Sequence, residues 1–464
     1  MMFNKPIISS CVLLLAALGT LMSPAIAAPT TYSLLATIAV PSDAANVQPG
    51  GVFTAFDVSF FDPTTRLYYV ADRSNASVDI FSGASLSFLG RATGFTGQAA
   101  TTSLSGPNGV LAVTSGGTTT LYASDGNSTL KVFNATNPAA PSLLQSISTG
   151  GAFRVDDMAY SPVTGQVLVT NNADAPAFAT LFQTTAGNAP VTIAHTGISI
   201  PGAGNFDGLE QAVWNPNTGT FFISVPSFNG DQGGVAEIKT DGTVGRLYKF
   251  ANMGLAACSP TGLALGASGH LMVGCGTSGT QTVVLDPTGT GSIVTTFSQI
   301  SGTDEIWYDP TLEDFFVTGV DAGGRVFDVI SDTSDTLLQS VSLGVSSNPH
   351  SIAVDPLSGD VFVPLAGSTL AVPDPVCPLG CIAVYSQTVP EPDTLALLGI
   401  GAAGLAWRRR KQLPVFRLCS ATSRSRTAGL WKLNDNFLPA VEPDAVHQVS
   451  SGDSALQREL PAGC

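Results

Sequence analysis

Six polar side chains lie at one repeated position of the chain and together could bind a metal ion. Each stands five residues before a turn that begins with Asp, Ser or Asn, or at the aligned position where this turn is absent. Carboxylate and amide oxygens suit a hard cation such as Ca²⁺, and an imidazole nitrogen extends the choice to Zn²⁺ or Mn²⁺. The candidate metal ligands are Asp57, Asn108, Asp156, Glu210, Asp304 and His350.

Two interpretations of these six residues remain open. Several carboxylates around one axis repel one another unless a cation or protons intervene, which would make Ca²⁺ or another divalent metal the cofactor. Such an ion would polarise a carbonyl group of a substrate, with His350 as the candidate catalytic base. Alternatively, Asp and Asn side chains at the start of a strand bond to neighbouring backbone and have a structural role only.

A strand–turn–strand phrase that occurs seven times positions these residues. Proline presets the backbone at the second position of its turn, and the preceding polar side chain caps that turn. Two further strand-like segments follow in each of the first six units, and four strands per repeat of about 50 residues predict a propeller blade. The turn recurs as Asp62-Pro63, Ser161-Pro162, Asn215-Pro216, Asp309-Pro310 and Asp355-Pro356.

The ends of the repeat region predict how the ring closes. The seventh unit ends after its third strand, at residues 381–386, and residues 33–40 supply a strand that has no other partner. Pairing of these two segments would complete the last blade, join the ends of the ring and remove the exposed edge there. The sequence therefore predicts an all-β fold, a seven-bladed β-propeller closed by an N-terminal strand.

Two phrases of the repeat resemble the YVTN and NHL group of propellers: Asn348-Pro349-His350-Ser351-Ile352-Ala353-Val354-Asp355 and Leu67-Tyr68-Tyr69-Val70-Ala71-Asp72. The resemblance implies the fold, but the group includes binding proteins, lactonases and lyases. Calcium-dependent lactonases of the gluconolactonase type also hold a metal in a propeller channel, and the present residues are similar to theirs in type only.

The first 27 residues have the three-part order of an export signal. Lys5 precedes an apolar run from Val12 to Leu18, and Ala25-Ile26-Ala27 provides small residues for cleavage. This order predicts a secretory signal peptide over residues 1–27, followed by the propeller over residues 28–389.

A second address signal follows the propeller, over residues 390–411. Pro390-Glu391-Pro392 leads into an apolar segment at 394–407, and Arg408, Arg409 and Arg410 come directly after it. The apolar segment is short for a span but could anchor the chain transiently in a membrane, with the basic cluster on the inside. The order resembles the PEP-CTERM sorting signal of Gram-negative bacteria, which implies processing by an exosortase and delivery to the cell surface or exopolysaccharide matrix. Residues 412–464 form a tail whose status the sequence leaves open.

Cysteine usage and charge agree with export. The pairs Cys258 with Cys275 and Cys377 with Cys381 are expected to form disulfides in an oxidising compartment.

The net charge of −15 excludes nucleic acid as a favoured partner, because such a surface repels phosphates. Nucleophile-elbow, HExxH, P-loop and EF-hand spacings are absent from the sequence.

The favoured hypothesis is an exported, non-catalytic binding or scaffold protein in the periplasm, on the surface or in the extracellular matrix. Its partners would be an exosortase-type enzyme and an exopolysaccharide or surface protein. The alternative is a metal-dependent, lactonase-like hydrolase that works through the acidic ring of the channel.

Overall fold

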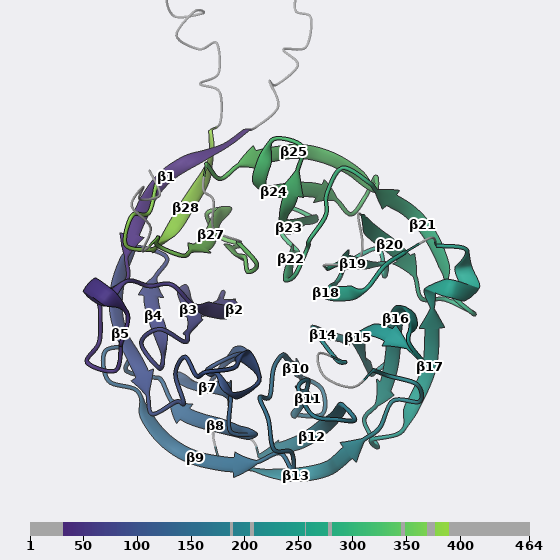
Figure 1. The fold of residues 1–464 in the computed structure, drawn as a ribbon, viewed down its shortest axis with the longest axis horizontal. Helices are drawn as coiled ribbons and strands as arrows, with labels where there is room; N and C mark the ends of the chain where they lie inside the picture. The colour runs from purple at the N-terminus through teal and green to yellow at the C-terminus, as the bar shows by residue number, and fades with distance from the viewer. Residues whose placement is uncertain are drawn as a thin grey trace, which may run out of the picture. The chain divides into compact units, whose positions relative to one another are not determined.

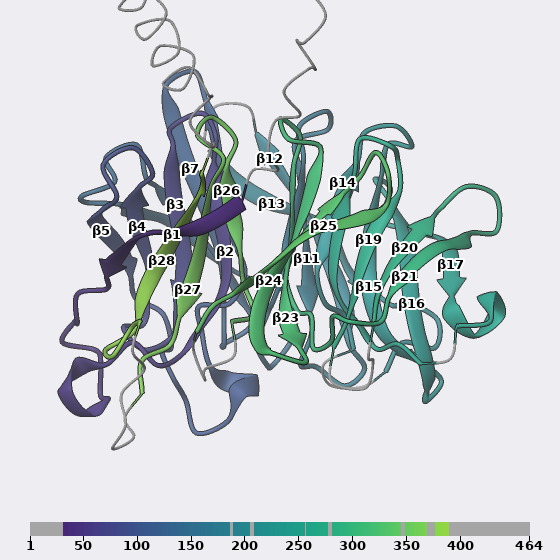
Figure 2. The same ribbon diagram turned by 90° about the horizontal axis from the view of Figure 1, so that it is seen from above.

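Each repeat folds into four antiparallel strands, and seven such sheets surround one axis (Figure 1). The computed structural model describes residues 31–185, 189–204, 208–255, 257–276, 281–344, 349–368 and 376–388. The turned view shows the strands of each sheet running between the two faces of the ring (Figure 2). The predicted seven-bladed β-propeller is therefore confirmed.

The blades follow one another along the chain, and the first strand of each is the innermost. The first three blades contain β2 (Phe56–Asp62), β3 (Leu67–Asp72), β4 (Ser77–Ser82) and β5 (Ser87–Thr93); β6 (Val110–Ser115), β7 (Thr118–Asp125), β8 (Thr129–Asn134) and β9 (Ser142–Ser148); and β10 (Met158–Ser161), β11 (Gln166–Asn171), β12 (Phe178–Thr185) and β13 (Ala189–Ile198). The next three contain β14 (Ala212–Asn215), β15 (Thr220–Phe228), β16 (Asp231–Lys239) and β17 (Val244–Lys249); β18 (Pro260–Leu265), β19 (Leu271–Cys275), β20 (Thr282–Asp286) and β21 (Ser292–Phe297); and β22 (Ile306–Asp309), β23 (Asp314–Asp321), β24 (Gly324–Ser331) and β25 (Thr336–Ser342). Three short 3₁₀ turns lie between strands: η1 (Pro49–Gly51), η2 (Thr102–Leu104) and η3 (Phe250–Met253).

The seventh blade joins the two ends of the ring. It consists of β26 (Ala353–Asp355), β27 (Asp360–Leu365), β28 (Cys381–Thr388) and, as its outermost strand, β1 (Thr31–Ala39). β1 pairs with β28 from Thr31 opposite Thr388 to Ala39 opposite Cys381. The predicted closure is thus confirmed. Because the two terminal strands pair within one blade, apolar side chains of β1, β27 and β28 share core clusters, and the ring has a hydrophobic core of its own, as a domain does.

The recurring turn between the first two strands is built as its sequence predicts. In blade 1, Asp62 Oδ1 accepts a hydrogen bond from the Thr64 amide over 2.9 Å. The Asp62 carbonyl accepts another from the Arg66 amide, which puts Arg66 in the left-handed region at φ 57°. Asn215 and Asp355 repeat the same side-chain cap in blades 4 and 7. These turns set where each inner strand ends.

Apolar side chains fill the spaces between neighbouring blades. One such cluster joins Leu168 and Leu181 of blade 3 to Phe221 and Ile223 of blade 4. The outermost strands alternate instead, as in β25, which exposes Leu338 and buries Val341. Packing of blade against blade therefore holds the inner strands in fixed positions around the axis.

Both expected cysteine pairs are bonded in the structure. Cys258 is linked to Cys275, with Cα atoms 5.0 Å apart, and Cys377 to Cys381, with Cα atoms 5.5 Å apart. The first pair joins the start of blade 5 to its second strand, and the second pair closes the loop before β28.

The predicted address signals fall outside the described residues. These are the signal peptide at 1–27, the sorting segment at 390–411 and the tail at 412–464. Within the described parts of residues 31–388, no helix is both long and apolar enough to cross a bilayer. The apolar segment at 394–407 lies beyond that range.

Candidate functional site

Five of the six predicted metal ligands meet in one cavity at the end of the channel where the inner strands begin. The cavity has a volume of about 720 Å³. It is lined by Asp57, Asp156, Glu210, Asp304 and His350, each at or just before the first strand of its blade.

A common backbone contact places these side chains. The amides of Asp156 and Glu210 bond to the carbonyls of Thr170 and Ser224, which lie in the second strands of the same blades. Asn108 makes the same contact with Ser124. Because this contact repeats from blade to blade, side chains scattered along the sequence converge on the axis.

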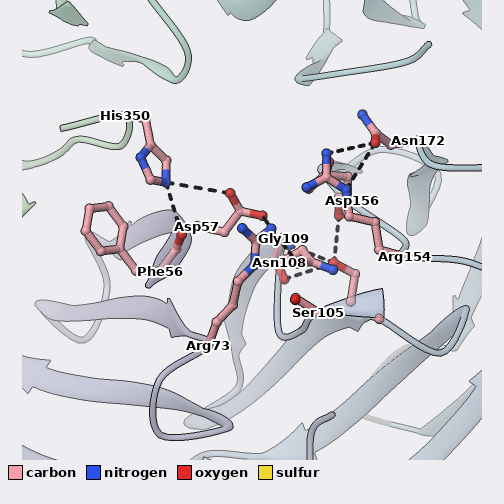
Figure 3. Close-up of polar contacts among 12 residues, drawn as sticks. Phe56, Asp57, Arg73, Ser105, Asn108, Gly109, Arg154, Asp156, Asn172 and His350 are labelled. Carbon is pink, nitrogen blue, oxygen red and sulfur yellow. Dashed lines mark hydrogen bonds and ion pairs between the residues drawn. The ribbon is translucent and has the colours of Figure 1, made fainter. Parts of the chain in front are cut away.

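Asn108, the sixth predicted ligand, is fully buried behind the cavity wall. Its Oδ1 accepts a hydrogen bond from Arg73 Nε over 2.9 Å, and its Nδ2 donates to the Val155 carbonyl over 2.8 Å (Figure 3). Arg73 also forms an ion pair with Asp57. The guanidinium therefore lies between two of the predicted ligands, in blades 1 and 2.

A second arginine holds the next carboxylate. Arg154 Nη2 is 3.1 Å from Asp156 Oδ2 and donates to Asn172 Oδ1 over 2.9 Å (Figure 3). Asn172 in turn donates to the Leu209 carbonyl of the next blade over 2.9 Å. Burial raises the pKa of Asp156 to about 6, and the nearby Arg154 charge opposes that shift.

His350 joins the last blade to the first. Its Nε2 lies 3.0 Å from the Phe56 carbonyl oxygen and 3.8 Å from Asp57 Oδ1. Its ring stacks on Phe56 with centroids 4.5 Å apart (Figure 3). These contacts give the candidate catalytic base a structural role at the ring closure.

Glu210 and Asp304 complete the acidic lining of this mouth. Burial raises the pKa of Glu210 well above its usual range, and the charge of Asp156 adds to the shift. Burial also raises the pKa of Asp304, and the nearby His350 offsets only part of this rise. Both carboxyl groups therefore favour their protonated form more than exposed acids do.

Two features of the described mouth bear on the predicted metal site. Within the described ranges, no group of three or more His, Cys, Asp or Glu side chains lies close enough together to hold a metal ion. Arg73 and Arg154 instead supply positive charge to Asp57 and Asp156. The metal assignment stays a prediction, and the contacts give it no support.

Sequence reasoning missed the arginines and a second layer of polar residues. Arg73, Arg154 and Arg325 all line the cavity but occupy no repeated position. Asp157 and Glu305 directly follow Asp156 and Asp304 and are 4% and 7% exposed. The acidic dipeptides Asp156-Asp157 and Asp304-Glu305 were the available signal for this second layer.

Gln211 belongs to the same second layer and ties three blades together. Its Oε1 accepts hydrogen bonds from the amides of Leu263 and Ile306 over 2.5 and 3.0 Å. Its Nε2 donates to the Ile306 carbonyl over 3.2 Å. The inner strands of blades 5 and 6 are therefore fixed relative to blade 4 at this level of the channel.

Residues 388–411 match the PEP-CTERM protein-sorting motif. The chain carries an exosortase-type sorting signal. The match begins at Thr388, the last residue of β28, and includes the predicted Pro390, Glu391, Pro392 and the arginines 408–410. A PEP-CTERM signal indicates an exported protein of Gram-negative bacteria that is sorted to the cell surface. No curated protein matches the chain, and its place in the YVTN and NHL group stays a prediction.

Proposed function

We propose that this chain is a non-catalytic binding or scaffold protein, delivered as a folded propeller to the cell surface or the exopolysaccharide matrix. A secretory signal at residues 1–27 would export it, and an exosortase-type enzyme would process it near Pro390-Glu391-Pro392. The channel and loops of the propeller would then face the matrix.

The position of the sorting motif carries this proposal. The motif starts at the last residue of β28, the strand that pairs with β1 to close the ring. Processing beyond this strand would leave all seven sheets intact. A fold whose two ends are joined within one blade suits release into the matrix, because the last blade keeps its fourth strand and the ring stays closed.

The contacts of the channel mouth support a non-catalytic role. Asp57, Asn108 and Asp156 already bond to arginines, and His350 bonds to the Phe56 carbonyl. A base or metal ligand needs a free lone pair directed at its substrate or ion. Here Asn108 and His350 link neighbouring blades, and Asp57 and Asp156 pair with arginines of their own blades.

Delivery can be tested by expressing the full chain in a Gram-negative host that contains an exosortase. Glu391→Ala should prevent formation of the shortened surface form, which immunoblotting of cell fractions detects. Glu442→Ala is a matched control, because Glu442-Pro443-Asp444 repeats the local sequence Glu391-Pro392-Asp393 outside the matched motif. Equal processing of wild type and Glu391→Ala would refute the proposed delivery.

The alternative of a metal-dependent hydrolase is favoured by one observation, the convergence of Asp57, Asp156, Glu210, Asp304 and His350 on one cavity. The two functions make opposite predictions for metal affinity. A hydrolase of this kind would bind a divalent ion tightly through these residues, whereas the binding protein would not.

A further inference from the structure

A second cavity of about 680 Å³ occupies the channel beside the acidic mouth. Inner strands of six blades, β2, β6, β10, β14, β18 and β22, form its wall. Glu305 borders both cavities. A cavity of this volume is large enough for a small organic molecule.

Aromatic side chains dominate one end of this cavity. They come from the later residues of the inner strands, near the turns: Phe60, Tyr160, Trp214, Trp307 and Tyr308. Phe60 and Trp307 meet edge to face with centroids 5.5 Å apart, although they belong to blades 1 and 6. Trp214 meets Phe221 in the same way at 4.8 Å, and its Nε1 is buried without a hydrogen-bond partner among the described residues.

Two buried carboxyl groups mark the other end. Asp157 of blade 3 and Glu305 of blade 6 both line this cavity, although their blades are three apart in the ring. Both side chains are more than nine-tenths buried. Glu305 Oε2 has no hydrogen-bond partner among the described residues. Burial and the charge of Asp157 raise the pKa of Glu305 well above its usual range, and a hydrogen-bond donor or positive charge beside Oε2 would stabilise the ionised form.

The cavity wall itself supplies no such charge. Its described lining contains the carboxyl groups of Asp62, Asp157 and Glu305 and includes no Lys, Arg or His. Asp62 is already engaged, since it caps the turn at Thr64 and accepts a hydrogen bond from Thr114. A cationic ligand would therefore meet two acidic groups and no opposing charge in this part of the channel.

We propose that the channel binds a small organic cation, with its ammonium group at Asp157 and Glu305 and its apolar part among the aromatic side chains. An ammonium group supplies a positive charge that the described lining lacks, and the aromatic rings offer apolar surface to the rest of the ligand. An apolar body matches a wall that offers few hydrogen-bonding groups, whereas a free sugar would leave many hydroxyls unpaired. The inference deepens the proposed binding role, because it names the ligand class of the same channel.

Calorimetry with a charge-matched pair of probes tests the site on the closed ring, residues 28–389. Choline and its neutral isostere 3,3-dimethylbutan-1-ol differ in charge but hardly in shape. We expect choline to bind at least about tenfold more tightly than the alcohol. Glu305→Gln should remove this difference, because it keeps the shape of the side chain and removes the charge.

A variant of the same blade provides the matched control. Asp328 in β24 is as deeply buried as Glu305, and neither of its oxygens has a hydrogen-bond partner among the described residues, but it does not line the cavity. Asp328→Asn should leave choline binding unchanged. If Glu305→Gln fails to fold, Asp157→Asn provides a second variant, which should weaken choline binding and leave the alcohol little affected.

Three outcomes would overturn the inference: no binding of choline, equal binding of choline and the alcohol, or equal losses in Glu305→Gln and Asp328→Asn. The delivery assay distinguishes this failure from failure of the proposed function. Glu305→Gln should be processed and delivered like wild type, and Glu391→Ala should still bind choline.

Discussion

Arg73 joins Asn108 to Asp57, two of the six predicted metal ligands. Arg73 Nε donates a hydrogen bond to Asn108 Oδ1 over 2.9 Å. The same guanidinium forms an ion pair with Asp57, which lies in the first strand of the blade that contains Arg73. One side chain therefore connects blades 1 and 2 and compensates an acidic residue of the ring.

Removing this arginine should destabilise the ring. Arg73→Met would leave Asp57 and Asn108 without their donor in a mostly buried setting, at a cost of about 2–4 kcal/mol in the free energy of unfolding. Denaturant unfolding measures this change. Arg246→Met, at an exposed arginine of β17, is the control and should change stability little; a similar small effect for both variants would contradict the structural role of Arg73.

The period of the sequence predicts the fold well because the fold itself repeats. The turns at Asp62, Asn215 and Asp355 are set by local chemistry, and the closing strand follows from counting strands. Arg73 and Arg154 could not be found in this way, since neither occupies a repeated position and only the folded ring brings them to Asp57 and Asp156. A periodic pattern shows where side chains converge but does not identify the unique residues that pair with them.

One turn should tolerate a stabilising substitution. Glu313 has φ 55°, whereas Gly165, Gly219 and Gly359 occupy the same position in other blades. Glycine adopts this backbone conformation without steric cost, so Glu313→Gly should raise the free energy of unfolding by about 0.5–1 kcal/mol. The reverse change, Gly165→Ala, should lower it by a similar amount, and thermal unfolding of the two variants checks both signs.

Stability should fall with rising pH because of Asp328. Burial raises its pKa to about 6 from 3.8, and the charge of Asp321 adds to the shift. Between pH 4 and 6 the folded state therefore binds more protons than the unfolded state, and stability decreases as the pH rises through this window. Asp328→Asn removes the charge and should gain about 1–3 kcal/mol at pH 8 and almost nothing at pH 4.

The control for this pH effect is an aspartate with the opposite environment. Asp241 is exposed, and hydrogen bonds from Thr243 lower its pKa. Asp241→Asn should give no gain at pH 8. Melting temperatures of both variants at the two pH values test the account, and a pH-independent gain in Asp328→Asn would refute it.

The disulfide between Cys258 and Cys275 should contribute substantially to stability. It closes a loop with a sequence separation of 17 and lies in the core cluster of blades 4 and 5. Replacing both cysteines by alanine should cost about 2–4 kcal/mol. Equal denaturant midpoints for the variant and the oxidised wild type would contradict this expectation.

Metal titration of the chelator-treated ring, residues 28–389, tests the non-catalytic role of the channel mouth most directly. Ca²⁺, Mn²⁺ and Zn²⁺ are added to wild type and to Asp304→Asn, and the heat of binding and the melting temperature are followed. Because Arg73 and Arg154 already compensate the acidic ring, we predict no saturable binding and no shift in melting temperature for either protein. Tight binding by wild type that Asp304→Asn abolishes would contradict this account and make the mouth of the channel a metal centre.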